Sequence, residues 1–303
     1  MSAAPLVRPP ASVPLRLTAG ARTMLTLHRR LHRVGVTLAG GLSGAPVTLP
    51  PLADAEGWLV TALPVAQAGA VAPDGSAVLE RQRYARRYVD LTGRFDAYLA
   101  GLSPATRASL RRKARRLANA SGGTIAVTAH HDPASIHEFY RKARGISRLT
   151  YQERLLDAGL PTGDDFIADM QRAAAAGRLR AWLLHIGGRA AAYLYCPVVG
   201  DTLLYAYLGH DPTFAALSPG TVLQYSALEA LFAEQRFARF DFTEGDGQHK
   251  RQFATGAVPC VDLLILRRSP ANLAVLGLLG GFDRVAALAK RCGAEPLVRP
   301  LLR

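Results

Sequence analysis

The sequence predicts an α/β protein in which helices flank a mixed, largely antiparallel β-sheet. The first observation is a run of three apolar segments at 179–186, 190–198 and 202–208, separated only by Gly187-Gly188 and Gly200-Asp201. Short connections that contain glycine join antiparallel strands. The second observation is that segments with helical periodicity lie before and after these strands. The third is a strong helix start after the loop that follows the third strand.

The helix after the third strand begins at Ser218-Pro219-Gly220-Thr221 and extends to about Gln235. Ser218 is the expected N-cap, because its hydroxyl accepts a hydrogen bond from a free N–H of the first turn. Proline suits the next position, and Gly220 leaves room for a ligand near the backbone. Free amides and the positive end of the helix dipole favour an anion, so the segment predicts a phosphate cradle. The alternative is that the segment is only an ordinary capped helix. The tetrapeptide taken by itself favours this alternative, because every helix needs a cap.

The first hundred residues are predicted to be separate from the main domain. Prolines at positions 5, 9, 10 and 14 predict a disordered tail over residues 1–14. Residues 15–38 fit either strands or a helix, and strands are expected at 58–65 and 88–91. We therefore expect three parts: the tail, an N-terminal region at 15–100, and a main domain at 101–303.

The main domain is expected to open with a basic helix. Ser103-Pro104 starts this helix, which extends to about Ala120 and carries arginines along its flanks. Asp132 is expected to cap the next helix. The remaining elements are helices at 133–143 and 164–176, strands at 124–128, 238–242 and 260–266, and a C-terminal helix at 271–291.

The chain is strongly basic, with 37 Lys and Arg residues against 23 Asp and Glu residues and a net charge of +14. This balance favours an anionic partner: coenzyme A, an acidic carrier protein, tRNA, or an anionic membrane surface contacted peripherally. The alternative is a solvated basic surface without a specific partner. The two interpretations are weighted equally.

The cysteines indicate neither a metal site nor a disulfide framework. Cys196, Cys260 and Cys292 are scattered without metal-ligand spacing. We therefore expect no metal and a reducing, cytoplasmic location. No apolar stretch reaches the roughly 18 residues of a transmembrane helix, so none is expected.

Four short motifs follow one another between residues 209 and 250. They are Gly209-His210-Asp211-Pro212, Ser218-Pro219-Gly220, Phe240-Asp241-Phe242 and a glycine loop from Gly245 to Lys250. In order and spacing they resemble the CelD-like branch of the GNAT acyltransferases, which is related to the FemAB peptidyltransferases. The resemblance extends over Ser103–Arg267 and implies a GNAT-type fold. A tandem arrangement, in which residues 15–100 are a degenerate GNAT-like half as in FemAB proteins, is an alternative.

The resemblance implies a binding site for an acyl donor. In GNAT proteins the strand before the phosphate-binding helix splays from its neighbour and pairs with pantetheine. The implied co-substrate is acetyl-CoA or another acyl-CoA. An acyl carrier protein is the alternative, because the usual Arg/Gln-x-x-Gly-x-Gly/Ala signature is missing. The residues that match these binding positions are Tyr207, Leu208 and Gly209 on the strand and Ser218, Gly220 and Thr221 at the helix start.

Acyl transfer to an amine needs a base for the amine and a donor for the oxyanion. Asp241 is the first candidate base, because it projects from a Phe-flanked strand near the expected site. A structural ion pair is its equally weighted alternative. Glu244 and His249 are further candidates, and histidine suits the role by its near-neutral pKa. Lys250 matches the family's lysine and is expected to neutralise an anionic substrate or intermediate, with a surface lysine as the alternative.

In the resembled family the segment at 147–152 borders the acceptor pocket, which implies acceptor contacts for Arg148, Tyr151 and Gln152. The expected function is transfer of an acyl group from acyl-CoA or an acyl carrier protein to an amine of a small molecule, an amino acid or a sugar. One alternative is an aminoacyl-tRNA-dependent, FemAB-like peptidyltransferase, which the positive charge suits. Another is a non-catalytic GNAT-fold scaffold in a surface-polysaccharide pathway.

Overall fold

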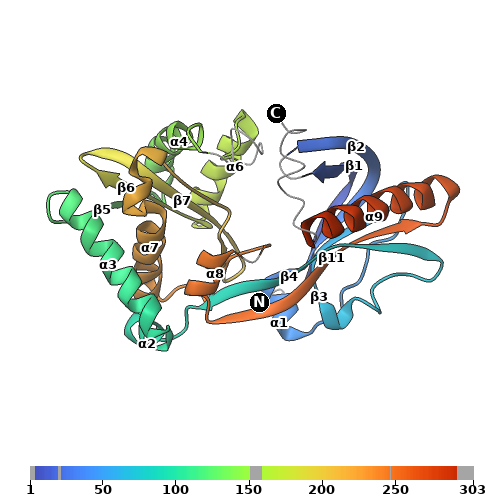
Figure 1. Cartoon of the computed structure of the whole chain (residues 1–303), viewed down its shortest axis with the longest axis horizontal. Helices are drawn as coiled ribbons and strands as arrows, with labels where there is room; N and C mark the ends of the chain where they lie inside the picture. The colour runs from blue at the N-terminus through green and yellow to red at the C-terminus, as the bar shows by residue number, and fades with distance from the viewer. Residues whose placement is uncertain (1–3, 20–21, 151–158, 246, 292–303) are drawn as a thin grey trace. The chain divides into compact units, whose positions relative to one another are not determined.

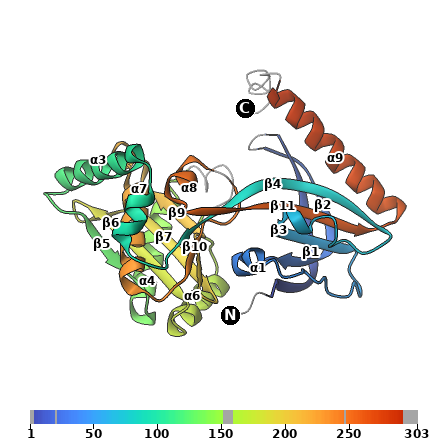
Figure 2. The same cartoon turned by 90° about the horizontal axis from the view of Figure 1, so that it is seen from below.

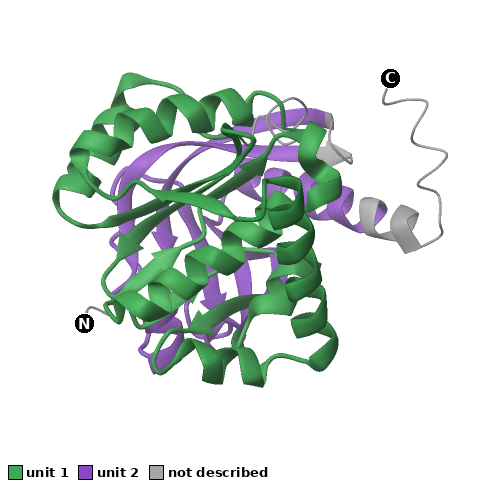
Figure 3. Ribbon diagram, turned by 90° about the vertical axis from the view of Figure 1, so that its left-hand side faces the viewer, with its two compact units in different colours: residues 1, 86–257 green, residues 2–85, 258–303 purple. Residues whose placement is uncertain are grey.

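The computed structural model of the protein describes residues 4–19, 22–150, 159–245 and 247–291. The chain divides into two compact units (Figure 3): unit 1 consists of residues 86–257, and unit 2 of residues 2–85 and 258–303. The predicted boundary at residue 101 and the single domain to residue 303 therefore differ from the structure. The physical reason is strand pairing, because β11 (Gly256–Arg267) pairs with β3 (Gly57–Pro64) from the first part of the chain.

Unit 2 begins with a long antiparallel hairpin. β1 (Leu6–Ala19) pairs with β2 (Arg22–Gly35) from its first residue onward, so residues 6–14 are a strand and the predicted tail over 1–14 is wrong there. The prolines are tolerated because β1 is the edge strand of its sheet, and the register is irregular between Arg8 and Ala11, where two of them lie. The ambiguous segment 15–38 consists mainly of strand residues.

The rest of unit 2 extends the sheet of this hairpin and adds helices to it. The strands of unit 2 are ordered β1–β2–β3–β11. Val275 and Leu279 of α9 (Pro270–Arg291) pack into the core beside Leu264 and Leu266 of β11. The segment between β2 and β4 (Ser76–Asp90) also contains α1 (Leu38–Ser43) and a short 3-10 helix, Val65–Gln67. In the part of the chain that the structure describes, no helix is both long and apolar enough to cross a membrane.

Unit 1 is built on a sheet whose strands are ordered β4–β10–β8–β7–β6–β5. Figure 1 labels β5, β6 and β7 of this sheet. All pairs are antiparallel except β10 with β8, which are parallel. The predicted fold class, a mixed and largely antiparallel sheet flanked by helices, is confirmed. The strands are β5 (Ala126–Ala129), β6 (Leu179–Ile186), β7 (Arg189–Val199), β8 (Thr202–Leu204) and β10 (Arg239–Asp241).

Helices cover both faces of this sheet (Figure 2). One face carries α2 (Phe95–Gly101), α3 (Pro104–Ala120) and α7 (Pro219–Glu234), and its core includes Leu117 and Leu228. The other face carries α4 (Pro133–Ser147) and α6 (Asp164–Ala175), and its core includes Phe139 and Met170. The predicted caps of α3 and α4 are confirmed, because Ser103 accepts from the amide of Thr106 and Asp132 from that of Ala134.

Candidate functional site

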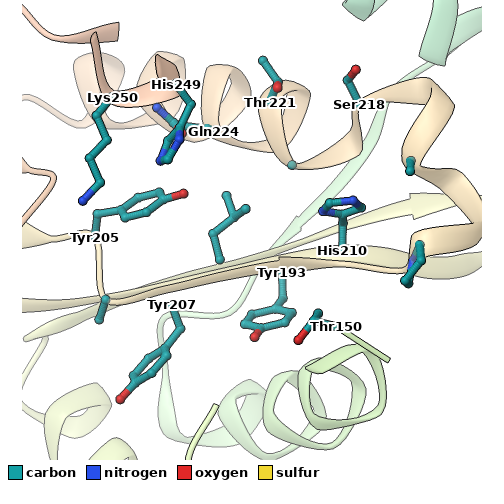
Figure 4. A pocket seen from close by; sticks show the side chains of 15 residues that line it. Thr150, Tyr193, Tyr205, Tyr207, His210, Ser218, Thr221, Gln224, His249 and Lys250 are labelled. Carbon is teal, nitrogen blue, oxygen red and sulfur yellow. The ribbon is translucent and has the colours of Figure 1, made fainter. Parts of the chain in front are cut away.

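A cavity of about 780 Å³ lies in unit 1 between a strand and a helix start (Figure 4). One wall is β9 (Tyr207–His210) with Tyr205 before it. The opposite wall is the first turn of α7, which the 3-10 helix Pro212–Leu217 precedes, and α8 (Gln248–Phe253) borders one end. The predicted site residues that line it are Tyr207, Leu208, Ser218, Gly220, Thr221, His249 and Lys250.

A β-bulge separates β8 from β9 and opens the sheet at the cavity. The amide of Ala206 donates to the carbonyl oxygen of Tyr195 at 3.3 Å, and Tyr207 is paired with the same residue. Two residues therefore oppose one, which bends the strand. Before the bulge, the amide of Tyr205 still donates to Asp241 of β10 at 2.8 Å. Among the described strands, β9 pairs with β7 only.

The free edge of β9 presents backbone groups to the cavity. The amide of Asp211 donates to Ala191 of β7 at 2.9 Å, which fixes the alternation along the strand. The N–H groups of Gly209 and Asp211 point toward β7, whereas those of Leu208 and His210 point away from it. Leu208 and His210 both line the cavity. This side of β9 can therefore pair with an extended ligand.

The first turn of α7 differs from the predicted cradle. Ser218 has a left-handed backbone, with φ 54°, and its side chain forms no capping hydrogen bond. Its N–H donates to Ala215, and the N–H of Thr221 donates back to the carbonyl of Ser218 at 3.1 Å. Ser218 therefore occupies the N-cap position as predicted, but the predicted capping hydrogen bond of its hydroxyl is wrong, because the 3-10 helix leads directly into α7. Within the described part of the chain, the Gly220 N–H keeps no hydrogen-bond partner, and the Ser218 and Thr221 hydroxyls lie beside it.

Gly209 is next to the cavity and does not line it. A Cβ on this residue would lie 2.5 Å from Cε1 of Tyr193, so the ring of Tyr193 occupies the space of the missing side chain. Tyr193 itself lines the cavity. The glycine therefore allows the ring to pack flat against β9.

α8 places His249 and Lys250 at one end of the cavity. The ammonium group of Lys250 is buried and donates to the carbonyl of Phe242 at 2.7 Å and to that of Glu244. Partial desolvation, and secondarily the charge of Lys250, lower the pKa of the His249 imidazole below its ordinary value. The ring of His249 lies 6.0 Å from that of Tyr205 between centroids. A neutral imidazole in this place is suited to accept a proton.

Asp241 lies in a fully buried ion pair. Its Oδ2 atom is 2.5 Å from Nη2 of Arg86, and Nε of Arg86 contacts both carboxylate oxygens. The Oδ1 atom also accepts from the amide of Thr243 at 2.8 Å. Asp241 does not line the cavity. The structure thus shows the arginine pairing that was the alternative to a role as base.

The other predicted residues are dispersed. Glu244 is exposed and contributes its carbonyl to Lys250, and its side chain does not line the cavity. Arg148 follows α4 and is exposed away from the cavity lining. Tyr151 and Gln152 lie outside the described residues. Their neighbour Thr150 is buried and lines the cavity.

Three cavity residues have no role in the sequence-based prediction. Burial raises the pKa of the Tyr205 phenol, which therefore stays protonated. His210 also lines the cavity, and desolvation lowers its pKa. Gln224 follows Gly220 by four positions, so the two share one face of α7. That spacing is the signal by which Gln224 could have been found.

Comparisons with known proteins agree with this architecture. A family model described as an acetyltransferase (GNAT) domain matches residues 104–251, all within unit 1. The structure of FemX superposes with a TM-score of 0.53 at 11% identity, covering 88% of this chain and 91% of that chain. A conserved protein of unknown function from Bacteroides thetaiotaomicron VPI-5482 superposes with a TM-score of 0.51 at 14% identity, covering 80% and 82%. None of the curated proteins compared with the chain matches it in sequence.

The site combines a bulged strand with a glycine-containing helix start. The family match is to a GNAT domain, and the chain as a whole shares the fold of FemX. By this match, unit 1 contains a GNAT-type acetyltransferase domain over residues 104–251.

Proposed function

We propose that the cavity of unit 1 transfers an acyl group from a phosphopantetheine thioester to an amine of a small molecule, an amino acid or a sugar. The observation that carries this proposal is the unpaired edge of β9 opposite the start of α7. A pantetheine arm contains amide groups, which can add to a strand edge as a further strand does. Its phosphate suits the positive end of a helix. Acyl-CoA and an acylated carrier protein both supply this group.

The two ends of the cavity differ in chemistry (Figure 4). Ser218 and Thr221 lie at one end, and we assign the phosphate to their hydroxyls and to the Gly220 N–H. Tyr205 and Lys250 lie at the other end, where we place the thioester. The pantetheine arm then runs along the free edge of β9 between these ends.

His249 is the base in this proposal. The neutral amine attacks the thioester carbonyl carbon, a C–N bond forms, and the carbonyl electrons move to oxygen. His249 takes the proton that the attacking nitrogen loses. The C–S bond then breaks, and the departing thiolate takes the proton that His249 had accepted. Lys250 orients α8 through its two carbonyl contacts.

A charge substitution at the phosphate end tests the donor site. Ser218→Asp places a carboxylate in the cavity lining. The carboxylate interacts favourably with the positive end of the helix dipole, so the melting temperature without ligand should not fall. CoA at about 100 times its Kd should stabilise the wild type by about 2.7 kcal/mol. The variant should lose most of this shift in a thermal melt.

Ser103→Asp is the matched control, because Ser103 caps α3 and lies outside the cavity lining. It should keep the full response to CoA. Acetyl-CoA and 4′-phosphopantetheine, tested in parallel, separate a CoA donor from a carrier-bound donor. A wild type that responds to none of these compounds contradicts the proposal.

The alternative donor is an aminoacyl-tRNA, and the basic face of α3 favours it. Arg111, Arg112, Arg115 and Arg116 are all exposed on this helix in unit 1. Binding of tRNA through such arginines should weaken steeply with salt, with log K falling linearly with log salt. Filter binding at rising salt, compared with the CoA response, decides between the two donors.

A further inference from the structure

The side-chain amide of Gln224 is buried in the cavity wall. Gln224 is 2% exposed and lies on α7 one turn after Gly220. Its Nε2 atom has no hydrogen-bond partner among the described residues. Buried amide groups are nearly always paired in folded proteins, and an unpaired N–H weakens the fold. An unpaired buried donor of this kind indicates that the amide binds a ligand atom.

The position of Gln224 limits what that ligand atom is. Gly220, Thr221 and Gln224 share one face of α7, and all three line the cavity. The close view shows the amide of Gln224 on the His249 side of Thr221, farther along the helix from Ser218 (Figure 4). An N–H group needs an acceptor atom. A neutral amide matches the negative charge of a phosphate less well than the helix start does. The amide carbonyl oxygens of the pantetheine arm are assigned above to the free edge of β9, so the remaining acceptor at the thioester end is the thioester carbonyl oxygen.

The lining of the cavity offers few other donors for that oxygen. The ammonium of Lys250 is engaged with the Phe242 and Glu244 carbonyls. His249 must be neutral and take a proton in the reaction proposed above, and its pKa is lowered accordingly. Tyr205 contributes a phenol whose ring packs beside His249. Gln224 differs from Lys250 and His249 because its donor is buried and has no hydrogen-bond partner among the described residues.

We propose that the Gln224 side-chain amide donates a hydrogen bond to the thioester carbonyl oxygen and stabilises the oxyanion of the tetrahedral intermediate. This inference rests on the proposed acyl-transfer function. When the amine nitrogen bonds to the carbonyl carbon, the carbonyl electrons move to oxygen, and the N–H of Gln224 contacts the resulting negative charge. When the C–S bond breaks, the carbonyl re-forms and the contact weakens. A donor that is preformed in a buried site stabilises developing charge without reorganisation.

Gln224→Met tests the inference without an identified acceptor. Methionine has a similar volume and removes the unpaired amide, so the melting temperature should stay the same or rise. The probe is acetyl-CoA labelled with ¹³C at the thioester carbonyl. In the wild type the infrared carbonyl stretch should move to lower wavenumber on binding. In Gln224→Met the Kd should change little and the stretch should stay at its position in water.

Kinetics give the second measurement once an amine is found that accepts the acetyl group. Loss of one oxyanion donor lowers kcat by roughly 100- to 1,000-fold in other enzymes, so a loss of that order with a small change in KM is expected here. Gln224→Glu should lose activity as well, because a carboxylate cannot donate to an oxyanion. The matched control is Gln235→Met, since the Gln235 amide is bonded to Gly93 and Phe232 outside the cavity. It should lower the melting temperature and leave the carbonyl stretch and kcat unchanged.

The outcomes separate the two proposals. If acetyl-CoA and CoA bind, and the carbonyl stretch is the same in the wild type and in Gln224→Met, the role of Gln224 is overturned while the donor site stands. If neither compound binds the wild type, the proposed function fails and the inference falls with it. A shifted stretch that the Met variant loses and the Gln235→Met control keeps supports the inference.

Discussion

Asp241 and Lys250 act on the same short segment, which begins at Phe242 and leads toward α8. The carboxylate of Asp241 accepts from the amide of Thr243, and the ammonium of Lys250 donates to the carbonyls of Phe242 and Glu244. Both charged groups are therefore already bonded to the protein itself. The sequence pattern located both residues near the site, but it could not show that their charges are engaged with the protein itself.

Asp241→Asn should be strongly destabilising. The substitution leaves the guanidinium of Arg86 buried without its counter-charge, and removal of one partner of a buried pair costs about 3–5 kcal/mol. Urea unfolding measures the loss. The control is Asp169→Asn, whose pairing with Arg172 lies at the surface of α6, and it should change stability by less than about 1 kcal/mol. Equal effects of the two substitutions would contradict the structural role of Asp241.

The titration of His249 should respond to the charge of Lys250. Desolvation and the ammonium group both lower the pKa of His249 below its ordinary 6.5. The base is therefore neutral at neutral pH, and activity should fall as the pH drops through this lowered pKa. Lys250→Met should raise the pKa of His249 toward its ordinary value and move the acid limb of the rate profile to higher pH.

Lys250→Arg keeps the charge and is the control for this titration. NMR of the His249 ring, assigned by loss of its signal in His249→Asn, reports the pKa directly. If the Met and Arg variants shift the titration equally, loosening of α8 rather than charge explains the effect.

Among the elements, those with local start signals could be predicted from sequence. α3 and α4 begin at the predicted residues because Ser103 and Asp132 satisfy first-turn amides within a few positions. The start of α7 was predicted correctly, but the capping hydrogen bond of Ser218 was not, because the preceding 3-10 helix sets its left-handed backbone. The bulge at Ala206 was missed, since it depends on the register with Tyr195 of another strand.

The β9 strand requires glycine at position 209 for close packing. Gly209→Ala would place a methyl group 2.5 Å from the ring of Tyr193, which should cost about 1–3 kcal/mol in unfolding free energy. In a Tyr193→Ala background the same change should cost much less. Gly145→Ala on α4 is the control, because nothing lies within 4 Å of its added Cβ, and helix propensity should make that change neutral or stabilising. Additive effects at positions 209 and 193 would contradict this packing.

At the scale of the whole molecule, local pattern predicted the fold class, whereas the anionic partner expected from composition stays a prediction. The division into units could not be predicted, because it depends on pairing between β3 and β11, which lie about two hundred positions apart, as Leu63 with Val261 shows. The net charge of +14 is compatible with CoA, a carrier protein or tRNA alike. The proposed function therefore depends on the acyl-donor site in unit 1.

Residue-resolved hydrogen exchange with and without CoA tests that site most directly. If the free edge of β9 holds the acyl donor, CoA slows exchange at the amides of Leu208, His210 and Gly220, which have no hydrogen-bond partner among the described residues. Gly209 and Asp211, whose amides face β7, should change little. Binding of CoA without this alternating protection, or with protection confined to other elements, would contradict the claim that the free edge of β9 holds the acyl donor.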